Sequence, residues 1–185
     1  HRCPAMPLGL RAGLTAMRIL KVKRSQDKEL FCLVETGVHA TMCFVDGVQA
    51  ATGCTYGKAN IEKLNYSKNA LTLIDVNNKK AVRVALNPEF QEKVLQSEFV
   101  SLRKKGLKPQ DIDPAIVEPL IALIMKEKED TLFKISEIFD YDFRETPGIF
   151  EWSRCQKCGE VVFSCGLRIK EGKILCIACS GYRMT

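Results

Sequence analysis

Residues 70–86 carry the sequence Ala-Leu-Thr-Leu-Ile-Asp-Val-Asn-Asn-Lys-Lys-Ala-Val-Arg-Val-Ala-Leu, and this stretch decides the fold class. Two apolar runs, 70–76 and 81–86, flank the polar turn 77–80, which is the pattern of a β-hairpin. Helical patterns lie on both sides of this hairpin, so the sequence predicts an α+β protein whose core domain combines helices with a sheet.

Apolar residues at helical spacing predict four helices around the hairpin. Asn87 before Pro88 and Asp113 before Pro114 are typical helix starts, because Asn and Asp accept hydrogen bonds from unpaired N–H groups and proline fits the first turn. Pro119 lacks the N–H that a helix interior needs, so we expect a kink or a break there. The predicted helices span residues 5–22, 41–51, 88–105 and 114–128.

The remaining segments predict strands, a loop and a domain boundary. Apolar runs at 29–35 and 132–139 indicate two further strands, and the Gly-, Asn- and Thr-rich segment 52–65 indicates an ordered loop. The composition changes after a turn-rich linker that contains Pro147 and Gly148. We therefore predict a core domain over residues 1–144 and a small second domain over residues 145–185.

Composition and charge exclude several classes of protein. The chain has 185 residues, 46% of them hydrophobic, which is normal for a protein that buries a core. The longest apolar runs, 120–125 and 174–179, have six residues each and are too short to span a bilayer. The net charge of +6 is below what nucleic-acid binding on charge alone requires. We expect a cytoplasmic protein because no export signal is visible, and we expect further residues upstream because the sequence starts at His1.

The strongest chemical signal is a pair of Cys-x2-Cys motifs, Cys155/Cys158 and Cys176/Cys179. Each motif places two thiolates on one side of a tight turn, as neighbouring vertices of a tetrahedron require. The module is too short to bury much core, so a bound Zn²⁺ would supply folding free energy on the order of 10 kcal/mol. The alternatives for these four residues are a redox dithiol or two disulfides.

The spacing leaves the type and the role of this finger open. A second pair that opens a helix indicates a treble clef, whereas two pairs on hairpins indicate a zinc ribbon. Six basic residues against four acidic ones between residues 145 and 185 make no basic face, so nucleic acid is disfavoured as a partner and a docking or dimerisation element is favoured. Cys165 is either an alternative fifth ligand or an exposed turn thiol.

A second candidate constellation lies in the core domain. His1 and Cys3 can chelate one cation or pair a base with a nucleophile, and Cys54 stands in the Gly-flanked motif 52–60 with Lys58, which would lower the thiol pKa if nearby. The alternative is that Cys3 and Cys54 are small buried hydrophobes. A phosphate-binding loop is excluded because Thr52 stands where such a loop needs glycine and Ala59 where it needs Ser or Thr.

These motifs together resemble the FmdE family, named for a protein associated with molybdenum formylmethanofuran dehydrogenase as one of its subunits. The resemblance covers nearly the whole chain, and its most specific parts are the 52–60 motif and the terminal finger. The matching segments are His1-x-Cys3-Pro4, Gly9-x-Arg11, Glu35-Thr36, Val45-Asp46-Gly47-Val48-Gln49, Thr52-Gly-Cys-Thr-x-Gly-Lys58-x-Asn60 and the four-Cys finger. The family opening is similar to His-Gly-His-x-Cys-Pro-Gly, and here Ala5 replaces the final Gly.

The resemblance implies an α+β core that forms intertwined homodimers, with the finger appended. It also implies a joint site of His1, Cys3 and Cys54 that binds a second metal ion or a small ligand, and three protein ligands would leave one position open. Asp46 and Gln49, on one helical face, are candidate ligand contacts or supports of the metal ligands, and the alternative for both is a solvated helix face or a local cap. Lys58 is either an anion contact or a plain surface lysine. His39 has no cysteine partner at ligand spacing and is interpreted as structural or exposed.

Three functions compete at this point. The first is a metal-binding accessory protein that handles metal or a one-carbon cofactor for partner subunits of a redox enzyme. The second is a ligand-sensing zinc-finger regulator that contacts nucleic acid or protein. The third is a thiol enzyme that uses Cys54 with His1 as base. The five cysteines outside the finger contain no ferredoxin-like run, so this chain alone should not catalyse formylmethanofuran oxidation.

Overall fold

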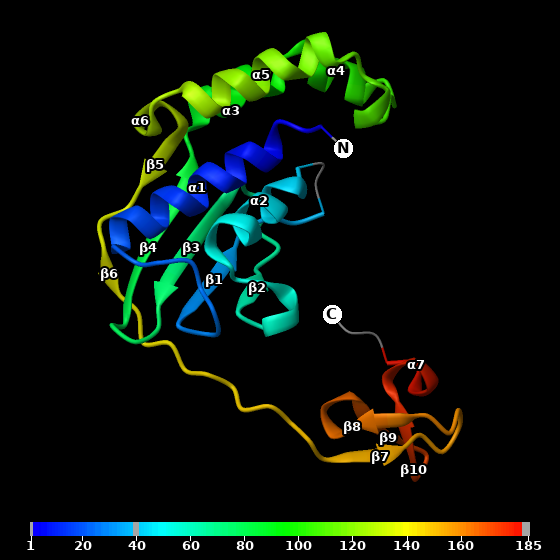
Figure 1. Ribbon diagram of the computed structural model, residues 1–185. Coiled ribbons are helices and arrows are strands. Elements are labelled where there is room, and N and C mark those ends of the chain that lie inside the picture. The colour runs from blue at the N-terminus through cyan, green and yellow to red at the C-terminus, as the bar shows by residue number, and fades with distance from the viewer. Residues whose placement is uncertain (1, 39–40, 183–185) are drawn as a thin grey trace. The chain divides into compact units, whose positions relative to one another are not determined.

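The computed structural model describes residues 2–38 and 41–182, so His1 and His39 lie outside the described residues. Contacts divide the chain into two compact units, residues 1–143 and 144–185. The first unit contains a mixed sheet with helices, and the second contains two small hairpins and a short helix. The predicted α+β class is therefore confirmed (Figure 1).

The predicted hairpin forms the centre of the core sheet. Antiparallel strands β3 and β4 pair from Ala70 opposite Ala85 to Asp75 opposite Lys80, and every residue of β3 is buried. Along the sheet the order is β2-β1-β3-β4-β5, and β6 also pairs with β4. The strands are β1 (Leu30–Val34), β2 (Ile61–Lys63), β3 (Ala70–Asp75), β4 (Lys80–Leu86), β5 (Phe133–Ile135) and β6 (Phe139–Asp140).

Two segments of the sheet differ from the sequence expectation. The segment 52–65, expected as a loop, contains a short 3-10 helix, Tyr56–Lys58, and then strand β2, which pairs in parallel with β1. The expected strand over 132–139 is divided into β5 and β6. Both differences involve strands of two or three residues, whose stability comes from pairing with a neighbour and not from their own pattern.

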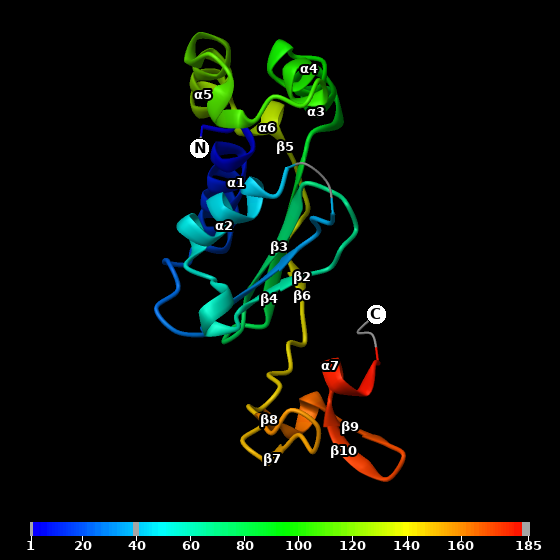
Figure 2. The same cartoon turned by 90° about the vertical axis from the view of Figure 1, so that its right-hand side faces the viewer.

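Helices α1 (Ala5–Leu20) and α2 (Cys43–Thr52) lie on the same face of the sheet (Figures 1 and 2). The two helices run in the same direction. Gly9 of α1 lies against Phe44 near the start of α2, and Gly13 lies against Ala51 further along both helices, so both helices begin at the same end of the layer. A β-carbon on Gly9 would stand 1.8 Å from the Phe44 carbonyl oxygen. Glycine is thus required here because the two backbones touch.

The helices that follow the hairpin extend beyond the sheet (Figure 2). The predicted helix 88–105 is wrong as a single element, because Ser97 caps a new helix by accepting a hydrogen bond from Val100 N. Of the kink or break expected at Pro119, the break does not occur, because one helix continues through this residue from Pro114 to Lys126. The four helices are α3 (Pro88–Leu95), α4 (Glu98–Lys104), α5 (Pro114–Lys126) and α6 (Glu129–Leu132).

The second unit is built from two antiparallel hairpins, β7–β8 and β9–β10, and one helix. Of its described residues, the apolar side chain of Leu175 and the thiol-bearing Cys155 are buried, together with Ser180. The elements are β7 (Trp152–Arg154), β8 (Val161–Phe163), β9 (Leu167–Lys170), β10 (Lys173–Cys176) and α7 (Ile177–Ser180). Across the described parts of both units, no helix combines the length and apolar character of a membrane span.

Candidate metal centres

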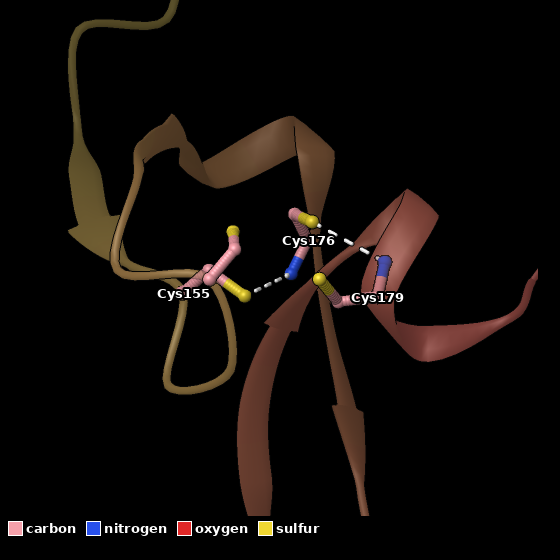
Figure 3. A group of neighbouring side chains, drawn as sticks. Cys155, Cys176 and Cys179 are labelled. Atoms are coloured by element: carbon pink, nitrogen blue, oxygen red, sulfur yellow. Dashed lines mark hydrogen bonds between the residues drawn. The ribbon is translucent and has the colours of Figure 1, made fainter.

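Four cysteines of the second unit converge on one point. Cys155 follows β7 and Cys158 lies in the turn after it, whereas Cys176 ends β10 and caps α7, and Cys179 lies within α7. Their four sulfur atoms all lie within 4.8 Å of one another, and Figure 3 shows the Cys155, Cys176 and Cys179 side chains turned toward one another. Zinc–sulfur bonds of about 2.3 Å place tetrahedral ligands ~3.8 Å apart, so this cluster fits a zinc ion.

The backbone of the finger is arranged to hold sulfur atoms. Gly159 adopts a left-handed φ of 76° and donates a hydrogen bond to the Cys155 carbonyl oxygen at 2.8 Å, which closes the turn. The N–H of Cys176 points at the Cys155 sulfur and the N–H of Cys179 points at the Cys176 sulfur, each at 3.3 Å (Figure 3). These N–H groups favour thiolates, which are the form that binds metal.

The pKa values of the finger cysteines are shifted in opposite directions. Backbone N–H groups, first that of Cys158 and then that of Cys176, lower the pKa of Cys155 to about 6. The hydrogen bond with Cys176 raises the pKa of Cys179 to about 12. Several thiolates this close repel one another, so a bound metal ion would favour the charged form of all four.

Cys165 is not part of this cluster. It lies in the 3-10 helix Ser164–Gly166 and is exposed. Among the described residues, the four finger cysteines are the one group of three or more His, Cys, Asp or Glu residues with all ligand atoms within 4.8 Å. The structure therefore supports the turn-thiol interpretation of Cys165.

In the core, the structure brings Cys3 to Cys43. Cys3 precedes α1 and is buried, Cys43 is the first residue of α2, and their side chains are hydrogen-bonded to each other. Burial raises the pKa of the Cys43 thiol to about 11, and the neighbouring Cys3 and Asp46 add to the rise. Sequence reasoning treated Cys43 only as part of a helix, and its position at the start of α2 is a signal that could have singled it out.

Cys54 lies at the other end of α2. It follows Gly53, which ends that helix with a left-handed φ of 72°, and it interacts with Cys32 of β1. The ten residues of α2 separate its two ends by ~15 Å. Within one chain, the structure therefore does not bring Cys54 to Cys3, and the third expected member, His1, lies outside the described residues.

The surroundings of Cys54 do not activate it. Its side chain is completely buried, and burial raises the pKa of the thiol to about 11. Lys58 does lower this pKa, as the sequence predicts, but burial outweighs the charge. Cys54 thus resembles the buried small hydrophobe that was its alternative interpretation, and the arrangement gives no support to a nucleophile at this position.

Gln49 and Lys58 hold the loop around Cys54. The Gln49 side-chain oxygen accepts a hydrogen bond from Tyr56 N at 3.3 Å, and Lys58 Nζ donates to the Ser25 carbonyl oxygen at 3.2 Å. Asp46, the other expected ligand contact, is exposed on α2 near Cys43. Of the three predicted contacts, Asp46 therefore lies near the start of α2, whereas Gln49 and Lys58 lie at the loop that follows its end.

Sequence reasoning missed the role of Asn60. Its Oδ1 accepts from Thr55 N at 2.8 Å, and its Nδ2 donates to the carbonyl oxygens of Asp27 and Leu30, both at 3.0 Å. The residue is completely buried and joins three segments of the core. The 52–60 motif is thus, in this chain, largely a device that fixes the loop.

A cavity of about 110 Å³ adjoins the Cys3 end of the helices. Its wall is mostly apolar, and the polar residues that line it are Cys3, Thr41, Asn69, Gln91 and Arg103. Leu8, Phe44, Val94 and Phe99 are among the apolar side chains that line it. A largely apolar cavity with a few polar groups is typical of small-ligand sites.

The fold and the finger together define a class: an α+β core protein that carries a module with four cysteines placed to hold a metal ion. A family model described as "FmdE, Molybdenum formylmethanofuran dehydrogenase operon" matches residues 1–134. The chain belongs to the FmdE family, so the resemblance seen in the sequence is confirmed.

Two known proteins are similar to this chain. A "Probable S-adenosyl-L-methionine-binding protein" of Archaeoglobus fulgidus is 33% identical over 194 residues. That alignment covers 98% of this chain but 50% of the relative, so the chain spans half the length of the curated relative it matches. A crystal structure of a tungsten formylmethanofuran dehydrogenase FmdE-like protein from Syntrophus aciditrophicus covers 99% of this chain and 86% of its own, with 19% identity and a TM-score of 0.60. At this identity the second similarity shows the fold alone.

Proposed function

We propose that this chain is a metal-binding accessory protein, not a stand-alone enzyme, and that it serves a redox enzyme of one-carbon metabolism. Its finger holds one structural zinc ion, and its core binds a second metal ion or a small ligand beside the apolar cavity. The observation that carries the proposal is the convergence of the four finger sulfurs within 4.8 Å.

The finger is treble-clef-like in this proposal. The first cysteine pair lies on a turn that leads into a hairpin, and Cys176 caps the helix that contains Cys179. A helix opened by the second pair is the feature that favours a treble clef over a zinc ribbon. The module has so few buried apolar side chains that metal binding is its main source of folding free energy.

Support for a one-carbon redox role comes from the names of related proteins. The description of the family model names a molybdenum formylmethanofuran dehydrogenase operon. The similar crystal structure is of an FmdE-like protein whose name refers to a tungsten formylmethanofuran dehydrogenase. The buried, high-pKa thiol of Cys54 favours a binding role over nucleophilic catalysis. A cytoplasmic location fits, because a reducing compartment keeps nine cysteines as thiols.

A second copy of the chain is the partner that we propose for the helical layer. Several large apolar side chains on α1 and α5, two helices in mutual contact, remain about half exposed: Met6, Leu14, Leu123 and Met125. Exposed apolar surface on neighbouring helices is typical of an interface. Light scattering of the purified chain should give the mass of a homodimer, and a monomer at micromolar concentration would contradict this part of the proposal.

Nucleic acid is not a partner in this proposal. The segment 145–185 contains six basic and four acidic residues, which gives a charge of +2. Four thiolates around one Zn²⁺ add a charge of −2, so the total is zero. The finger then carries no net positive charge, which phosphate binding requires. A gel shift at low salt should show no complex with DNA or RNA.

Metal analysis of the full chain tests the proposal. Mass spectrometry of metal content, after equilibration with chelator-buffered zinc, should give two zinc ions per chain. Cys176→Ser should lose the finger ion, and the matched variant Cys165→Ser should keep it. One equivalent in the wild-type chain would remove the core site and restrict the proposal to the finger.

A further inference from the structure

The apolar cavity of the core lies where two clusters of apolar side chains meet. Leu8, Phe44 and Leu86 belong to the main core cluster, and all three line the cavity. Phe99 and Val100, which line it as well, belong to the second cluster, formed by α4 and α5. Side chains that face an empty space lose dispersion contacts, so a molecule that fills the cavity would join the two clusters.

The break between α3 and α4 shapes one wall of the cavity. The Ser97 hydroxyl donates a hydrogen bond to the Val94 carbonyl oxygen at 2.6 Å and accepts one from Val100 N at 3.4 Å. One helix therefore ends and the next begins at this residue. Val94 and Leu95 of α3 line the cavity together with Phe99 and Val100 of α4, so two short helices that meet at Ser97 build this wall.

Arg103 is the charged residue of the wall. It is half-buried in the last turn of α4, and its guanidinium donates a hydrogen bond to the Leu107 carbonyl oxygen. Within the part of the chain that the structure describes, no carboxylate pairs with Arg103. A guanidinium carries several N–H donors in a planar fork that matches a carboxylate. The wall therefore offers a cation without an anionic partner beside an apolar space.

The opposite wall and the volume define the rest of the ligand. The Thr41 hydroxyl donates a hydrogen bond to Asn69 Oδ1 at 2.7 Å, so these two polar side chains are already paired with each other. The cavity measures about 110 Å³. Because a dry cavity of ~150 Å³ accommodates benzene, this space suits an aliphatic tail of ~four carbons.

We propose that the cavity binds a short-chain aliphatic carboxylate. Its tail lies among the apolar side chains, and its head group accepts hydrogen bonds from Arg103. The inference rests on the proposed function, which gives the core a metal ion or a small ligand, and it names the class of that ligand. Charge-assisted hydrogen bonds are roughly twice as strong as neutral ones, so the site prefers the carboxylate to an uncharged molecule of the same shape.

Two probes that share one tail test this preference. Isothermal titration calorimetry measures the binding of isovalerate and of isovaleramide to the full, zinc-loaded chain at neutral pH. We expect isovalerate to bind about tenfold more tightly. Arg103→Met should remove this difference and keep the affinity for the amide. Lys104→Met is the matched control, because Lys104 is an exposed cation on the same helix that does not line the cavity.

A second variant tests the place of the tail. Val94→Phe puts a larger side chain into the cavity and should abolish binding of both probes, because it occupies the space that the tail needs. Circular dichroism checks that the variant is folded. If Val94→Phe does not fold, the comparison between Arg103→Met and Lys104→Met decides.

The outcomes separate this inference from the proposed function. Equal affinity for the two probes in the wild type, or equal losses in Arg103→Met and Lys104→Met, would overturn the inference. Absence of isovalerate binding to a chain that holds two zinc ions would also overturn it and leave the proposed function intact. A chain with one zinc ion and no affinity for either probe would contradict both the inference and the proposed core site.

Discussion

Gly47 of α2 lies so close to Met6 of α1 that a β-carbon on residue 47 would stand 2.0 Å from the Met6 carbonyl oxygen. The same β-carbon would stand 2.4 Å from Leu10 N. Neither neighbour can move away, because both are backbone atoms within a helix. This contact sets the separation of the two helices and, with it, the position of Cys43 beside Cys3.

Gly47→Ala should therefore destabilise the core strongly. An inserted methyl group with no free space costs ~3 kcal/mol, since one helix must shift against the other. Urea denaturation followed by circular dichroism measures the change. Gly57→Ala is the control, because a β-carbon there meets no atom within 4 Å and stability should stay within ~0.5 kcal/mol. Equal stability of the two variants would contradict the described helix contact.

The ion pair between Glu35 and Arg83 should make stability depend on pH. Glu35 is largely buried and accepts hydrogen bonds from Arg83 Nε at 2.5 Å and Nη2 at 2.8 Å. The hydrogen bonds from Arg83 lower the pKa of Glu35. A carboxyl whose pKa is lower in the folded state stabilises the fold above its unfolded pKa of ~4.3, and this stabilisation is lost as pH falls through the folded value.

Arg83→Met should thus cost about 2 kcal/mol at pH 7, because it leaves a buried carboxylate unpaired. The difference from wild type should shrink as pH falls through ~4, because burial makes the unpaired Glu35 of the variant protonate first and the wild-type pair is lost at lower pH. Lys80→Met breaks the exposed pair with Asp140 and should change stability by less than ~1 kcal/mol. A constant difference between Arg83→Met and wild type down to pH 3 would argue against the pair.

Asn60→Ala should loosen the loop that covers Cys54. The substitution leaves the N–H of Thr55 and the carbonyl oxygens of Asp27 and Leu30 without their partner, at a cost of ~3 kcal/mol. Reaction of thiols with an aromatic disulfide reagent should then become faster at Cys54. Asn77→Ala, an exposed asparagine in the hairpin turn, should change neither stability nor reactivity. Slow Cys54 reaction in Asn60→Ala would refute this role.

Metal removal should unfold the finger and leave the core folded. Trp152 is the single tryptophan of the chain and lies in β7, so its fluorescence reports the finger alone. A strong zinc chelator should change the Trp152 emission while the helical circular dichroism, which comes mainly from the core, persists. Cys176→Ser should show the same emission without chelator, and Cys165→Ser should match wild type. Loss of helix signal together with the emission change would show that the two units fold as one.

Much of the fold could be predicted because its signals are local. The hairpin at 70–86 has two apolar runs and a polar turn, and Asn87 and Asp113 begin helices through their own side chains. The break at Ser97 was missed because its apolar neighbours continue the helical pattern across it. Strand β2 was missed because three residues carry no pattern of their own and become a strand only beside β1.

The two candidate metal sites also differ in how far they could be predicted from the sequence. The finger cysteines are predictable because two residues between ligands bring both sulfurs to one side of a turn, whatever surrounds them. The joint site of His1, Cys3 and Cys54 depended on segments far apart in the chain meeting, and sequence spacing carries no information about that. No cysteine or histidine lies at ligand spacing from Cys43 in the sequence. Its neighbour in the fold is Cys3, which the contact between α1 and α2 brings beside it.

The sequence by itself determined the α+β class, the family and the four finger cysteines that lie together, because each depends on residue types at short, regular spacing. Only the tertiary structure decided which thiols meet in the core: Cys3 with Cys43 at the start of α2, and Cys54 with Cys32 beyond its end. The physical reason is that glycine lets two helix backbones touch, and this contact, not sequence distance, places side chains beside each other.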